Sequence, residues 1–146
     1  MKTGMHILLI NPNTSQQTTA LMLRQARACL PPGVLLHGAT AGRGAAMITD
    51  EAGLKIAEQE VLRLGLGFAQ GDDSQAGRAI IVAAFGNPGL ELLRAALPER
   101  VAAFGIGEAA MLQAARDEQG RPRRFGIATT TPGLEASIVA SVAALG

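Results

Sequence analysis

The organisation of this chain is decided by one stretch, IIVAAFGNPGL, which spans residues 80–90. Its unbroken apolar run is typical of a parallel strand that is buried on both faces. The run ends in a corner of glycine, asparagine and proline residues, which mark a turn. In open parallel sheets the carboxyl ends of the strands border the crevice where ligands bind. The residue expected to face that crevice is Ala84, whose methyl group has no acid–base or nucleophilic chemistry.

Strand-like and helix-like stretches alternate on both sides of this corner. Further strands are predicted at residues 6–10, 34–37, 101–106 and 125–128, and helices at residues 14–30, 50–65, 88–97, 107–119 and 134–145. This alternation predicts a layered α/β/α fold with a mostly parallel sheet. Because crossovers between parallel strands are right-handed, the corners at 11–15, 84–89 and 129–133 are expected at the same edge of the sheet. Three polar corners at one edge predict a binding site.

The predicted corners also suggest how individual helices begin. The hydroxyl of Thr14 or Ser15 is suited to cap the helix after the first strand, and Asn87 is expected to cap a helix that has Pro88 in its first turn. A capped helix N-terminus can receive a carboxylate or phosphate. The glycine-rich segment 38–44 matches neither a Walker loop nor a dinucleotide fingerprint, so we expect a mobile loop there and rank nucleotide binding last.

Composition narrows the class of protein. The 146 residues carry a formal net charge of +1, 48% are hydrophobic, and there is one cysteine. We therefore expect no nucleic-acid or membrane partner, and no internal disulfide or multi-cysteine metal cluster. The N-terminus leads directly into a predicted strand, so we expect no signal peptide and a cytoplasmic protein.

Several isolated residues have a chemical interpretation and a structural one. Cys29 lies on the apolar stripe of its predicted helix, which favours a buried thiol over a reactive one. His6 and His37 are each expected to stand alone, and the paired acids Asp72 and Asp73 to be solvated, so no metal site is predicted. Glu108 lies at a predicted helix N-terminus, where it either complements the helix dipole or forms part of the crevice wall.

Four motifs, taken in order, resemble the aspartate/glutamate/hydantoin racemase superfamily, and more closely its hydantoin and allantoin racemase branch. They are INPNTS at 10–15, AFGNPGL at 84–90, GIGEA at 105–109 and FGIATT at 125–130. The resemblance implies one flavodoxin-like half of a two-domain racemase fold. It also implies inversion of a stereocentre without a cofactor, in which a thiolate on one face removes a proton and a thiol on the other face returns one.

The sequence departs from that pattern in two places. The family usually has its first cysteine directly before the Phe-Gly pair, where this chain has Ala84. The second cysteine belongs to a later segment that these 146 residues do not contain. By this comparison residues 1–100 form a first α/β domain and residues 101–146 begin a second, similar domain that is truncated.

The sequence thus predicts a cofactor-independent racemase-family protein that acts on or binds a small carboxylate or ureide and lacks the two-cysteine proton transfer. The alternative is a non-catalytic binding module or an inactive truncated paralogue. Glu108 is the only acid in a matching motif and hence the candidate for any proton transfer. The residues expected to bind the ligand are Asn11, Asn13, Thr14, Ser15, Phe85, Gly86, Thr129, Thr130 and Thr131. A free edge strand favours a homo-oligomer.

Overall fold

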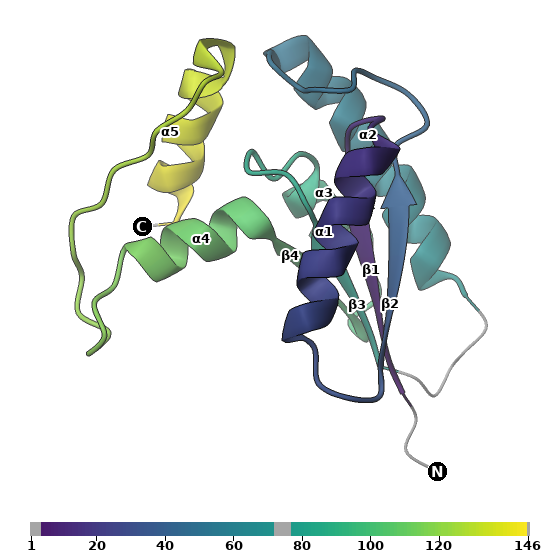
Figure 1. Ribbon diagram of the computed structural model, residues 1–146. Coiled ribbons are helices and arrows are strands. Elements are labelled where there is room, and N and C mark those ends of the chain that lie inside the picture. The colour runs from purple at the N-terminus through teal and green to yellow at the C-terminus, as the bar shows by residue number, and fades with distance from the viewer. Residues whose placement is uncertain (1–3, 72–76, 146) are drawn as a thin grey trace.

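The computed structural model describes residues 4–71 and 77–145. In chain order the elements are β1 (Met5–Asn11), α1 (Gln16–Cys29), β2 (Val34–Thr40), α2 (Glu51–Ala69), β3 (Arg78–Val82), α3 (Leu90–Ala96), β4 (Val101–Gly105), α4 (Ile106–Ala114), the 3₁₀ turn η1 (Pro132–Leu134) and α5 (Glu135–Ala144). The four strands form one parallel sheet in the order β2-β1-β3-β4. Helix α1 lies on one face of the sheet and α2 lies behind it (Figure 1). The predicted α/β layered fold is confirmed.

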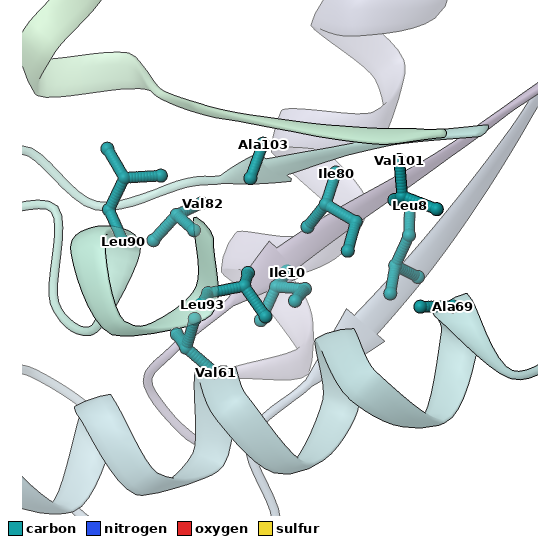
Figure 2. Packing of buried hydrophobic residues seen from close by; sticks show 10 residues of the cluster. All are labelled: Leu8, Ile10, Val61, Ala69, Ile80, Val82, Leu90, Leu93, Val101 and Ala103. Atoms are coloured by element: carbon teal, nitrogen blue, oxygen red, sulfur yellow. The ribbon is translucent and has the colours of Figure 1, made fainter. Parts of the chain in front are cut away.

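The core lies between the sheet and the helices α2 and α3. Strand residues two apart point to the same face, so alternate aliphatic side chains of β1, β3 and β4 meet the two helices (Figure 2). The cluster consists of Leu8, Ile10, Val61, Ala69, Ile80, Val82, Leu90, Leu93, Val101 and Ala103. Gly65 lets the helices approach closely, because a β-carbon there would lie 2.7 Å from Leu93 Cδ1. This core fixes the carboxyl ends of the strands, where the predicted corners begin.

Residues 125–128, predicted as a strand, are not one. No strand among the described residues pairs with this segment, and a β-ladder needs a neighbouring strand to accept its hydrogen bonds. The preceding helix α4 ends at Ala114, earlier than the predicted end near residue 119. In Figure 1, α4, the long segment after it and α5 extend to one side of the sheet. We refer to residues 106–145 as the arm.

The boundary expected at residue 100 separates two strands of the same sheet. β4 begins at Val101 and pairs with β3 along its whole length, from Arg78 with Val101 to Val82 with Gly105. We therefore propose a boundary after β4, with the arm as the start of the second unit.

The acids Asp72 and Asp73 lie outside the described residues. No helix among the described residues is both long enough and apolar enough to cross a bilayer.

Candidate functional site

A cleft of about 370 Å³ lies at the carboxyl edge of the sheet. One wall is the corner Ala84–Gly86 after β3, and the opposite wall is the segment Ala128–Thr131 with the start of α5. The side chains of Ile48 and Leu54, from the loop before α2 and its first turn, line the cleft as well. The turn at Ala84 is closed by a hydrogen bond of 3.0 Å from the Asn87 N–H to the Ala84 carbonyl. The sheet edge therefore supplies one wall of the cleft and the arm supplies the other.

Five of the predicted ligand-binding residues line this cleft together with Ala84. They are Phe85, Gly86, Thr129, Thr130 and Thr131. The cleft is lined by apolar side chains and hydroxyl groups, and none of its lining residues is ionisable. The Thr129 and Thr131 hydroxyls lie 2.8 Å apart, and the Thr131 N–H donates to Thr129 Oγ1 at 3.1 Å. Such a surface suits a polar ligand that is held by neutral hydrogen bonds.

The corner Asn11–Ser15 is not part of the lining of that cleft, and its polar groups bond mainly to each other. The buried Asn11 side chain lies 2.8 Å from Asn13 Oδ1, 2.9 Å from the Ser15 carbonyl and 3.0 Å from Thr19 Oγ1. Asn13 Oδ1 also accepts from the Ser15 N–H at 2.9 Å. Ser15 caps α1 as predicted, accepting from the Thr18 N–H at 3.2 Å. The Asn11 side chain and the Asn13 Oδ1 atom are therefore already paired within the corner.

Glu108 lies outside the cleft, beside Arg94 of α3. The guanidinium donates to both carboxylate oxygens, at 3.0 and 2.7 Å, and its Nε donates to the Ala103 carbonyl of β4 at 3.0 Å. Hydrogen bonding to Arg94 lowers the pKa of Glu108, against the opposing effect of burial. A carboxylate held ionised in this way is a weaker base than an unpaired one. The geometry favours a structural role, in which Arg94 joins α3 to β4 and α4.

Asn87 couples the corner to α4 rather than capping the helix that follows it. Its Oδ1 accepts from the N–H groups of Gly107 and Glu108, at 3.1 and 3.3 Å. The helix α3 instead begins after Gly89, whose φ of 71° suits glycine. The prediction that Asn87 caps the next helix is therefore wrong. α4 begins after a glycine that has no side chain to cap it, and Asn87 satisfies its first donors instead.

We expect Asn87→Ala to lower the free energy of unfolding by about 2 kcal/mol, combining the loss of a cap with a left-handed backbone at φ 47° that alanine tolerates poorly. Asn87→Asp keeps an acceptor oxygen and a residue type that adopts this conformation, so its stability should stay close to that of the wild type. Urea denaturation at pH 7 measures both variants. Equal stability of the alanine variant and the wild type would show that the side chain is not a cap.

The glycine-rich loop is anchored to α2 by a buried carboxylate. Glu60 is fully buried and accepts from the Gly42 N–H at 2.7 Å, from Arg43 at 3.2 Å, and from Arg63 at 3.2 and 2.8 Å. The Thr14 N–H donates to the Ala45 carbonyl of the same loop at 3.1 Å. The expected mobile loop is therefore wrong in part: its residues 38–40 belong to β2, Gly42 is held by Glu60, and the adjoining Ala45 is held by Thr14. The anchored loop leads to Ile48 at the cleft.

Two expectations about isolated residues are wrong. Cys29 is exposed, because it is the last residue of α1, at the opposite end of the helix from the Asn11–Ser15 corner. His6 and His37 do not stand alone. Parallel pairing of β1 and β2 brings their rings to a centroid distance of 5.3 Å, with His37 Nε2 3.3 Å from His6 Nδ1.

The sequence analysis did not predict the apolar residues that line the cleft, or the buried Glu60 and the Arg94–Glu108 ion pair beside it. A signal was present for Glu60, because it falls four residues from both Ile56 and Leu64 on the predicted apolar face of its helix. Ile48 and Leu54 carried a weaker signal, since they flank the Asp50 cap of a helix that starts at the carboxyl edge. The sequence carried no signal that Arg94 would pair with Glu108, because this ion pair depends on how α3 packs against α4.

Comparisons with known proteins show the family and support the fold. The family model described as Asp/Glu/Hydantoin racemase matches residues 7–146. The structure is similar to that of the allantoin racemase from Klebsiella pneumoniae, with a TM-score of 0.79 and 28% identity over 97% of this chain and 54% of that one. It is also similar to the allantoin racemase from Pseudomonas fluorescens, with a TM-score of 0.65 and 32% identity over 75% of this chain and 44% of that one. This chain therefore spans about half the length of these relatives. No curated protein sequence gives a match.

Proposed function

Because the chain belongs to the Asp/Glu/hydantoin racemase family, we propose that it binds a small carboxylate or ureide in the cleft between Ala84–Gly86 and Ala128–Thr131. One observation carries this proposal: two motifs some 40 residues apart in sequence line one cleft of about 370 Å³. Ligand pockets typically begin at about 300 Å³, so the volume suits a small molecule. The solved relatives are allantoin racemases, and allantoin is a ureide.

The chemistry of the cleft favours a neutral ureide over an acidic amino acid with two carboxylates. A ureide presents amide N–H and carbonyl groups, which the hydroxyls of Thr129–Thr131 can both accept from and donate to. The lining residues carry no cation to neutralise a carboxylate. A carboxylate ligand would have to rely on hydroxyl and backbone N–H donors. We therefore rank a hydantoin-like ring first among the proposed ligand classes.

The same cleft supports binding without two-thiol proton transfer. Ala84 lines it. The resemblance places the family's first cysteine at this position, and an alanine methyl group cannot take a proton. The chain's single cysteine, Cys29, is exposed at the far end of α1 and cannot substitute. Ala84 is thus the observation that favours the second candidate, a non-catalytic binding module or an inactive truncated paralogue.

Glu108 is the proposed proton carrier for any inversion that the chain performs. It belongs to a matching motif, but its ion pair with Arg94 and its place outside the cleft make it a poor one. If the protein inverts a substrate, Glu108→Gln should abolish that activity. An unchanged rate would remove Glu108 from the mechanism.

We further propose that the protein works in the cytoplasm without a cofactor and self-associates.

Calorimetry with allantoin, hydantoin and aspartate tests the binding proposal. We expect allantoin to bind, and Thr130→Val to weaken its binding about fivefold, because one neutral hydrogen bond contributes about 1 kcal/mol. Ser141→Ala is the control: its hydroxyl lies on α5 outside the cleft lining and donates to the Ser137 carbonyl. Binding that is absent, or that falls equally in both variants, would contradict the proposed site.

A further inference from the structure

The loop between β2 and α2, residues 41–50, carries one of the side chains that line the cleft. The loop contains no regular secondary structure, so no ladder of backbone hydrogen bonds fixes its path. Most of its side chains are exposed, whereas Ile48 is half-buried and lines the cleft. A loop of this kind keeps a defined shape only where individual contacts hold it. The position of Ile48 therefore depends on the contacts that hold the loop.

The buried carboxylate of Glu60 holds the start of this loop on α2. It accepts from the Gly42 N–H at 2.7 Å and from Arg43 Nε at 3.2 Å, and its third donor is Arg63 of the same helix. The Glu60 side chain is 1% exposed, whereas those of Arg43 and Arg63 are 68% and 54% exposed. A buried carboxylate needs such donors, and charge-assisted hydrogen bonds are stronger than neutral ones. Two of the three donors belong to the loop, so loss of the carboxylate releases the loop from α2 at this point.

Ile48 and Leu54 form the apolar wall of the cleft next to the corner, but they are supported differently. Leu54 belongs to α2 and lies against the corner, since a β-carbon at Gly86 would be 3.4 Å from Leu54 Cδ2. Ile48 lies over the first turn of the same helix, where its Cγ2 would be 3.4 Å from a β-carbon at Gly53. The helix fixes Leu54 directly. Ile48 reaches its place only because the loop is held on α2.

We propose that Glu60 is a positioning residue for the cleft: by holding the loop on α2 it fixes Ile48, and so sets how tightly the cleft takes an apolar substituent on a ureide ring. Glu60 does not line the cleft, so it acts on a ligand only through the loop. If Glu60 served stability alone, its loss would affect every ligand equally. The proposal rests on the binding of a ureide in this cleft, proposed above, and adds a residue that adjusts its specificity.

Calorimetry with hydantoin and 5-isopropylhydantoin measures this effect, because the ratio of the two dissociation constants isolates the substituent. We expect the wild type to bind 5-isopropylhydantoin about tenfold more tightly, since burial of the isopropyl group against Ile48 and Leu54 removes apolar surface from water. Ile48→Ala should lower this preference about fivefold. Glu60→Gln should lower it about threefold, because an amide has one acceptor oxygen and cannot serve the Gly42 N–H and both arginines.

Two further variants separate positioning from stability. Ile80→Val creates a small cavity in the fully buried core and destabilises the protein away from the loop, so it should leave the preference unchanged. Arg43→Gln removes one exposed loop contact with little cost to folding, and it should lower the preference about twofold. This variant keeps the proposal testable if Glu60→Gln does not fold.

The double variant Ile48→Ala/Glu60→Gln completes a thermodynamic cycle. Because Glu60 acts through Ile48, the double variant should show the same preference as Ile48→Ala alone. A preference that Glu60→Gln and Arg43→Gln leave unchanged, or that Glu60→Gln lowers equally with and without Ile48, overturns the positioning role and leaves the proposed function standing. A wild-type protein that binds neither hydantoin overturns the proposed function, and this inference with it.

Discussion

Gly107→Ala is expected to destabilise the protein by about 3 kcal/mol or more, which is a large fraction of the stability of a typical domain. A β-carbon at position 107 would overlap the carbonyl oxygen of Phe85, and it would lie 2.7 Å from the Phe85 carbonyl carbon and 3.1 Å from the Asn87 amide nitrogen. Both groups belong to the corner that forms the cleft wall. Because the closest atom is backbone, no side-chain rotation relieves the overlap, and either α4 or the corner must move.

The matched control is Gly67→Ala, in the interior of α2. A β-carbon there meets no atom within 4 Å, so only the helix preference of alanine acts and the protein should gain about 0.5–1 kcal/mol. The same substitution therefore has opposite signs at the two positions. Thermal and urea denaturation of both variants measure this. A Gly107→Ala protein as stable as the wild type would contradict the close packing of the corner on α4.

Glu60→Gln is expected to lower the free energy of unfolding at pH 7 by about 2 kcal/mol. Hydrogen bonds from Arg63, the Gly42 N–H and Arg43 lower the pKa of Glu60 from its usual 4.5 to about 2, against the effect of burial. Such a change corresponds to at most about 3.4 kcal/mol. We expect less, because the guanidinium groups of Arg43 and Arg63 are mostly exposed and are screened by water.

The contribution of Glu60 to the free energy of unfolding is expected to fall as the pH is lowered. Above about pH 4.5 Glu60 is ionised in both states, so its contribution is complete. As the pH falls from 4.5 towards 2, the unfolded chain takes up the proton first and the contribution is lost. The Glu60→Gln protein should therefore lose less stability than the wild type over this range, whereas Glu118→Gln, an exposed control, should follow the wild type. If the free energy of unfolding of the wild type and of Glu60→Gln fell equally as the pH is lowered from 4.5 to 2, Glu60 would not anchor the loop.

The fold was predictable where the signal is local. Apolar runs and caps such as Ser15 report on their own segments, and the structure confirms that cap. The segment 125–128 has a strand-like sequence, but strand formation depends on a partner elsewhere. Asn87 shows the same limit, because its side chain satisfies donors 20 residues away in α4 instead of those of the next helix.

The site was predictable in part, for a similar reason. The corner at 84–86 and the threonines at 129–131 do line one cleft. The parallel-sheet rule reached this result from a wrong premise, because residues 125–128 are not a strand of the sheet and the threonines come from the arm. It could not tell that the polar groups of Asn11 and Asn13 bond mainly to each other, or that Glu108 faces Arg94. Those pairings depend on side-chain directions and on helix packing. The family motifs therefore identify a scaffold more reliably than they identify its chemistry.

The central proposal is that this chain binds a ureide in the cleft beside Ala84 without inverting its stereocentre. The most direct test follows the optical rotation of optically pure allantoin with and without the protein, at a concentration that calorimetry has shown to saturate the cleft. We predict that the rotation decays at the rate of the buffer alone. A decay rate that rises in proportion to protein concentration would contradict the account.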